Sequence, residues 1–123
     1  MLVVAFVMFG VAVLIGSILA VLHLREGAAA KPPWPFGALH GLLAIGGLVG
    51  LVLMLGGSPR GLDQGTASFG NIAAVFLALA AVVGITLFAA GLRKRKLPAV
   101  LIGIHATLAV SGFVILAAYV FPG

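Results

Sequence analysis

Apolar residues occupy four long and nearly uninterrupted stretches of the chain, at residues 2–24, 38–57, 69–92 and 98–121. Each stretch is long enough for a helix to cross a bilayer core of about 30 Å, because a helix rises about 1.5 Å per residue. The stretches are continuous rather than alternating, which argues against the strands of a membrane barrel. The pattern therefore predicts an all-α bundle of four transmembrane helices.

Short segments rich in turn-forming or polar residues separate these stretches. Residues 27–37 (GAAAKPPWPFG) predict a proline-rich turn, residues 58–68 (SPRGLDQGTAS) a polar loop, and residues 93–96 (RKRK) a tight basic turn. Trp34 and Tyr119 lie near predicted helix ends, where aromatic side chains favour the membrane interface. The first stretch lacks the leading positive charge of a signal peptide, so we expect it to be retained as a span.

The amino-acid composition indicates which solvent surrounds the chain. Of the 123 residues, 63% are hydrophobic and only 7% are charged, whereas soluble domains carry about 25% charged residues. Lipid must therefore surround most of the chain, and we expect one membrane domain over residues 1–123. The absence of cysteine excludes disulfides, zinc–thiolate sites and iron–sulfur clusters.

The charged residues are concentrated at one side of the predicted bundle. The first and third loops share that side and carry six basic residues and one acid: Arg25, Lys31, Arg93, Lys94, Arg95 and Lys96, with Glu26. The other side carries only Arg60 and Asp63. The positive-inside rule predicts cytoplasmic first and third loops and outside termini, in a bacterial inner membrane. Because topology explains the net charge of +5, we expect no binding to nucleic acid.

The chain also contains an internal repeat. An offset of 65 residues aligns residues 31–51 with residues 96–116, and an offset of 68 relates the ends of the first and third helices. The matched pairs include Lys31/Lys96, Pro33/Pro98, His40/His105, Ala44/Ala109, Gly47/Gly112, Gly16/Gly84 and Arg25/Arg93. Two parallel hairpins, over residues 1–57 and 69–121, would be related by a pseudo-twofold axis along the membrane normal. The alternative to a true repeat is chance matching, since membrane spans use few residue types. Chance explains the matches at Lys, Pro and His least well, because these residues are rarer in spans.

Two of the three histidines, His40 and His105, are a matched pair in this repeat. Each follows a proline by seven residues, so both are expected at the same depth, about 10 Å into their helices. Small residues follow each histidine on the same helix face: Ala44 and Gly47, and Ala109 and Gly112. This pattern predicts one haem b between the two imidazoles, with room for a flat macrocycle beside the small residues. Lys31, Lys96, Arg93 and Arg95 would meet its propionates.

In this plan the chain resembles small four-helix membrane b-type cytochromes with histidine ligands, such as the cytochrome b561 group. The resemblance covers the four helices and the histidines of the second and fourth. It implies electron transfer with quinone or a membrane redox partner. Hydrolytic catalysis is not expected, because the chain has no carboxylate pair and no plausible set of nucleophile, base and acid. Many such proteins carry two haems on four histidines, and here no histidine is left for a second haem on the other side.

Other interpretations of the same residues stay open. Small residues in membrane helices commonly serve helix packing, as expected for Gly46-x-x-x-Gly50. The histidine pair is also compatible with another metal, a quinone, or hydrogen bonds between helices. His23 is a possible third ligand, a partner for a propionate or quinone, or an interfacial side chain. A cofactor-free subunit of a larger membrane complex, or a homodimer, is the main alternative function; no carboxylate within a span supports a cation-coupled transporter.

Overall fold

Four long helices make up the protein, which we describe from a computed structural model covering residues 1–27 and 34–123. They are α1 (Leu2–Glu26), α2 (Trp34–Leu55), α3 (Phe69–Leu92) and α4 (Ala99–Val120). No strand occurs within the described ranges. Each helix is long and apolar enough to cross a membrane, with a mean hydropathy of 2.2 to 2.8 over its most apolar window. The chain is therefore an integral membrane protein, and the predicted all-α bundle is confirmed.

The helix bounds differ from the predicted stretches mainly at α2. This helix begins at Trp34, four residues before the predicted start, and so includes the last part of the predicted turn. Pro35 then lies in the first helical turn, where the missing N–H of a proline costs no hydrogen bond. Residues 28–33, which include Lys31 and Pro33, lie outside the described residues.

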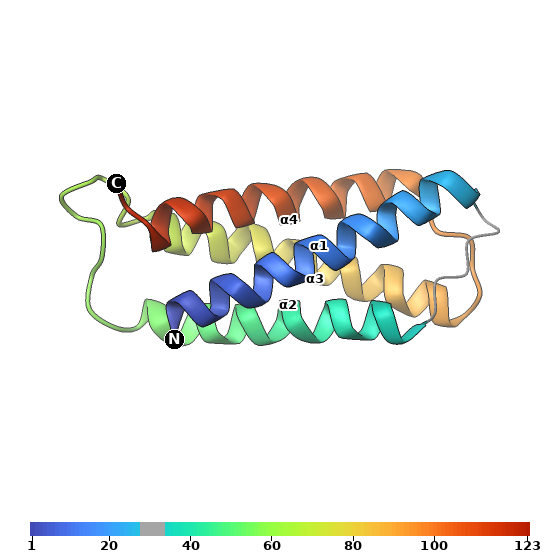
Figure 1. Ribbon diagram of the computed structural model, residues 1–123, viewed down its shortest axis with the longest axis horizontal. Coiled ribbons are helices and arrows are strands. Elements are labelled where there is room, and N and C mark those ends of the chain that lie inside the picture. Colours follow the sequence, from blue (N-terminus) through green and yellow to red (C-terminus); the bar gives the residue numbers. More distant parts are fainter. Residues whose placement is uncertain (28–33) are drawn as a thin grey trace.

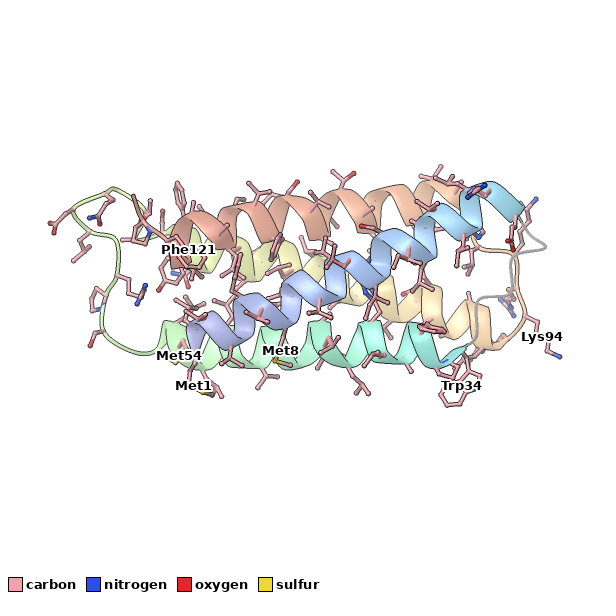
Figure 2. The ribbon with its side chains drawn as sticks, in the orientation of Figure 1. Met1, Met8, Trp34, Met54, Lys94 and Phe121 are labelled. Atoms are coloured by element: carbon pink, nitrogen blue, oxygen red, sulfur yellow. The ribbon has the colours of Figure 1, made fainter. Side chains whose placement is uncertain are left out.

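The helices run alternately up and down, so the bundle has two distinct ends (Figure 1). We call the end with both chain termini and the α2–α3 loop the terminal end. The opposite end, where α1 and α3 finish and α2 and α4 begin, is the basic end. Figure 2 shows Trp34 and Lys94 at the basic end, and Met1, Met54 and Phe121 toward the terminal end. Around the bundle, α1 and α3 each pack against both α2 and α4. It follows that α2 and α4 face each other diagonally, as do α1 and α3.

Two glycines of α2 allow the close approach of α1 and α2 in the first hairpin. A Cβ atom on Gly46 would lie 2.5 Å from Cε of Met8, and one on Gly50 would lie 3.4 Å from Cβ of Ala5. The Gly46-x-x-x-Gly50 motif therefore faces α1 and acts in helix packing, as predicted. Without a hydrophobic driving force between helices in lipid, such close contact is a main source of association.

Among the described residues, buried side chains occur only in the terminal half of the bundle. Leu51 and Leu116 are completely buried there, each with 0% of its surface exposed. The buried residues of α1 end at Ala12 and those of α3 end at Ala80. Among the described residues of the basic half, none is buried: this holds for residues 13–26, 34–46, 81–92 and 99–111. The packed core thus stops partway along the bundle.

Tyr119 belongs to this core rather than to an aromatic belt. Only 4% of its surface is exposed, and a Cβ atom on Gly70 would lie 2.8 Å from its ring. The glycine of α3 leaves room for the tyrosine of α4. The interfacial position predicted for Tyr119 from its place near a helix end is therefore wrong. Trp34, in contrast, is 66% exposed at the basic end, as an interfacial residue should be.

The α2–α3 loop is tied to the end of α4 by Arg60. Nη2 of Arg60 donates a hydrogen bond to the carbonyl oxygen of Val120 at 3.2 Å, and its guanidinium carbon lies 6.0 Å from the centre of the Tyr119 ring. A cation is favourable at this place because the last carbonyl groups of a helix carry partial negative charge. Arg60 therefore joins the loop to the last turn of α4 at the terminal end.

Candidate cofactor site between two histidines

His40 and His105 lie at matched positions and meet inside the bundle. Each is the seventh residue of its helix, α2 or α4. Their ring centres are 5.9 Å apart, and the ring planes are inclined by 77°. Since α2 and α4 are diagonal neighbours, the two imidazoles meet across the centre of the bundle rather than at its lipid-facing surface. The repeat predicted equal depth for the two residues, and their helix positions agree with it.

Each imidazole is held by a backbone carbonyl of the other helix in its hairpin. Nδ1 of His40 lies 2.8 Å from the carbonyl oxygen of Ala12 in α1. Nδ1 of His105 lies at the same distance from the carbonyl oxygen of Ala80 in α3. Because a carbonyl oxygen only accepts, Nδ1 must carry the proton in both rings. The bonds remove the cost of placing an N–H group without a partner at membrane depth.

This tautomer leaves Nε2 of both rings with a free lone pair. Within residues 1–27 and 34–123, Nε2 of neither ring forms a hydrogen bond. Neither Nε2 is a fully buried atom that lacks a hydrogen-bond partner. An imidazole that donates from Nδ1 to a carbonyl and offers Nε2 is the usual form of a histidine that binds a metal. Two imidazoles that bind one ion from opposite sides, each at about 2 Å, would have ring centres about 6 Å apart. The observed separation fits that arrangement.

Gly16 and Gly84 contact the two rings, and sequence reasoning gave them no function. A Cβ atom on Gly16 would lie 2.8 Å from Cε1 of His40, and one on Gly84 would lie 2.9 Å from Cε1 of His105. The two glycines are a matched pair at the offset of 68 residues, as are Ala12 and Ala80. The match between the two glycines in the repeat was therefore a signal of their importance. It did not indicate which ring each glycine contacts.

Gly47 and Gly112 contact neighbouring helices rather than the space between the histidines. A Cβ atom on Gly47 would lie 3.1 Å from the ring of Phe9, and one on Gly112 would lie 2.8 Å from Cγ of Leu77. Phe9 and Leu77 are themselves related by the offset of 68. These contacts close the bundle on the terminal side of the histidine pair. Ala44 and Ala109, one turn from each histidine, are half-buried.

The remaining predicted site residues lie nearer the basic end. His23 lies seven residues beyond Gly16 in α1, which places it about 10 Å further toward that end. No group of three histidine or acidic residues able to hold a metal occurs among the described residues, so His23 does not join the pair. Arg93 and Lys96 are exposed on the α3–α4 connection, and Lys31 lies outside the described residues.

Comparisons with known proteins supply no relative for this chain. No family model, no curated protein and no solved structure matches it.

Proposed function

We propose that this protein is a membrane-embedded b-type cytochrome that holds one haem between His40 and His105. The observation that carries the proposal is the pair of inward-facing imidazoles, each with Nδ1 bonded to a carbonyl and Nε2 free. Ionisable side chains within membrane spans are costly and tend to be functional. A pair related by an internal repeat is harder to explain by chance than a single histidine.

The distribution of buried residues supports a flat group on the basic side of the histidines. On the terminal side, Phe9 and Leu77 fill the positions beside Gly47 and Gly112. On the basic side, no described residue of the four helices is buried. A macrocycle that extends from the histidine pair toward the basic end would contact these partly exposed side chains. Ala44 and Ala109 follow the histidines by one helical turn on the terminal side, so they would lie at the opposite edge of such a group.

The chain's own residues would set the properties of the bound group. Haem supplies one-electron redox chemistry when bound. The carbonyl groups of Ala12 and Ala80 orient the histidines and strengthen them as electron donors. Arg93 and Lys96, which are exposed on the α3–α4 connection, would supply positive charge for the propionates. The same role is predicted for Lys31, which lies outside the described residues.

The place of the site within the membrane limits the kind of electron transfer. We place the basic end in the cytoplasm of a bacterial inner membrane and both termini outside, because basic loops are retained on the cytoplasmic side. A single haem in one half of the bilayer acts as a relay with quinone or a membrane redox partner. A reporter fused to the C-terminus should be active only outside the cytoplasm; cytoplasmic activity would overturn this orientation.

The test of the cofactor is a spectrum of the protein purified from cells supplied with haem. The proposal expects a Soret band and sharp visible bands that appear on reduction with dithionite. The alternative function, a cofactor-free subunit of a larger complex, expects a colourless protein that purifies with large partners. A colourless product from haem-supplied cells would overturn the proposal.

A further inference from the structure

The histidine rings are restrained from two sides, and both restraints come from one turn of the neighbouring helix. In the first hairpin, the carbonyl of Ala12 accepts from Nδ1 of His40. Four residues later, Gly16 lies against Cε1 and Nδ1 of the same ring, at 2.8 and 3.2 Å from its would-be Cβ atom. A methyl group at this position would overlap the ring, so the observed ring position requires glycine.

The second hairpin repeats this arrangement with its own residues. The carbonyl of Ala80 accepts from Nδ1 of His105, and Gly84 lies against Cε1 and Nδ1 at 2.9 and 3.3 Å from its would-be Cβ atom. The supporting helices, α1 and α3, are diagonal to each other. Each ring is therefore fixed by a different helix, and the two planes are inclined by 77°.

We propose that Gly16 and Gly84 are positioning residues that hold the imidazoles of His40 and His105 crosswise on the two faces of the bound haem. This inference rests on the proposed function and adds the geometry of its ligands. Each imidazole donates electron density to one iron d orbital, and the orientation of its ring plane determines which orbital that is. Crossed rings therefore act on two different orbitals and keep them close in energy, whereas parallel rings act on one orbital and separate them.

This geometry has consequences that helix packing alone does not have. A ferric low-spin haem with crossed imidazoles gives an electron paramagnetic resonance signal with one large g value, whereas parallel imidazoles give a rhombic signal. The glycines also preserve the hydrogen bond from each Nδ1, which makes the imidazole a stronger donor and favours ferric iron. Loss of this bond should therefore raise the midpoint potential.

The experiment uses the full-length purified protein in its ferric state. We expect the unaltered protein to give the large-g signal. Gly16→Ala and Gly84→Ala should each retain haem, lose that signal in favour of a more rhombic one, and raise the midpoint potential. The two shifts should be similar, because the two contacts are nearly identical in the structure.

Matched controls come from two glycines near the same histidines. Gly41 follows His40 in α2, and Gly103 precedes His105 by two residues in α4; a Cβ atom on either would meet nothing within 4 Å. Gly41→Ala and Gly103→Ala should leave both the signal and the potential unchanged. If they shift the potential as much as the substitutions at Gly16 and Gly84, the positioning role is contradicted.

The outcomes separate this inference from the proposed function. Haem binding with a rhombic signal in the unaltered protein would overturn the crosswise geometry and leave the cytochrome intact. An unaltered signal and potential in Gly16→Ala and Gly84→Ala would overturn the role of the glycines. If both variants fail to fold, the signal of the unaltered protein still decides the geometry. A protein without haem would overturn the proposed function, and this inference with it.

Discussion

The helices are mainly apolar in both the terminal and the basic half of the bundle, but the two halves are packed differently. The terminal half has a continuous core around Leu51, Leu77 and Leu116, and Arg60 ties its loop to α4. The described residues of the basic half include no buried side chain. The histidine pair lies near the boundary, since its carbonyl partners, Ala12 and Ala80, are the last buried residues of α1 and α3.

This difference separates the packed part of the molecule from the part in which we propose a cofactor. Interlocking side chains stabilise the terminal half through many short-range contacts. In our proposal, the bound haem adds contacts between the helices of the basic half. The following changes test that separation, from the largest expected effect to the smallest.

Removal of either histidine should have the largest effect. His40→Ala and His105→Ala each leave the proposed iron with one protein ligand, so we expect loss of most of the bound haem. Absorbance at the Soret band per unit of protein measures this loss. His23→Ala is the matched control and should retain haem, because His23 does not join the pair. Equal haem content in all three variants would contradict the proposal that His40 and His105 bind the haem.

Removal of a core leucine should separate stability from haem binding. Leu116→Ala opens a cavity in the terminal half, and we expect it to lower the free energy of unfolding by about 2 kcal/mol. Leu42→Ala, at a 70% exposed position of the basic half, should change it by less than about 0.5 kcal/mol. Unfolding in mixed micelles by increasing denaturing detergent measures both. Equal losses would show that the two halves are not packed differently.

A change in the basic turn should increase stability. Lys94 has a φ of 53°, a left-handed conformation that costs a residue with a side chain about 1 kcal/mol. Lys94→Gly should therefore stabilise the protein by up to about that amount in the same unfolding assay. Lys96→Gly serves as the control, because Lys96 has no positive φ and should gain nothing. A loss of stability in Lys94→Gly would indicate that the lysine side chain makes a contact that outweighs this strain.

Removal of the loop contact at the terminal end should have the smallest effect. Arg60→Ala removes the hydrogen bond to Val120 and the positive charge at the end of α4, and we expect a loss of about 0.5 to 1 kcal/mol. Haem content should not change, since Arg60 lies at the opposite end from the proposed propionates. A change in the haem spectrum of Arg60→Ala would contradict the separation of the two halves.

The sequence predicted the four helices because long apolar stretches and basic turns are strong signals in membrane proteins. It also predicted the matched depth of His40 and His105 through the internal repeat. It did not predict the carbonyl partners or the contacts of Gly16 and Gly84. Lipid and protein interior are both apolar, so no polar face marks which side of α1 or α3 points inward.

The same limitation explains the residues whose surroundings differ from expectation. Gly47 and Gly112 are small residues on the histidine face, and their sequence does not say whether a cofactor or a side chain lies beside them. The structure places Phe9 and Leu77 there. Tyr119 near a helix end fitted an aromatic belt, but Gly70 opposite it leaves space for the ring inside the bundle. Both cases depend on the partner helix, which local sequence does not contain.

The central claim is that His40 and His105 together hold a single haem, and the ratio of haem to polypeptide in the purified protein tests it most directly. The haem content, determined from the reduced pyridine complex, is divided by the protein content from amino-acid analysis. We predict one haem for each chain. A ratio near zero after expression with added haem, or a ratio of two, would contradict a site built from one pair of histidines.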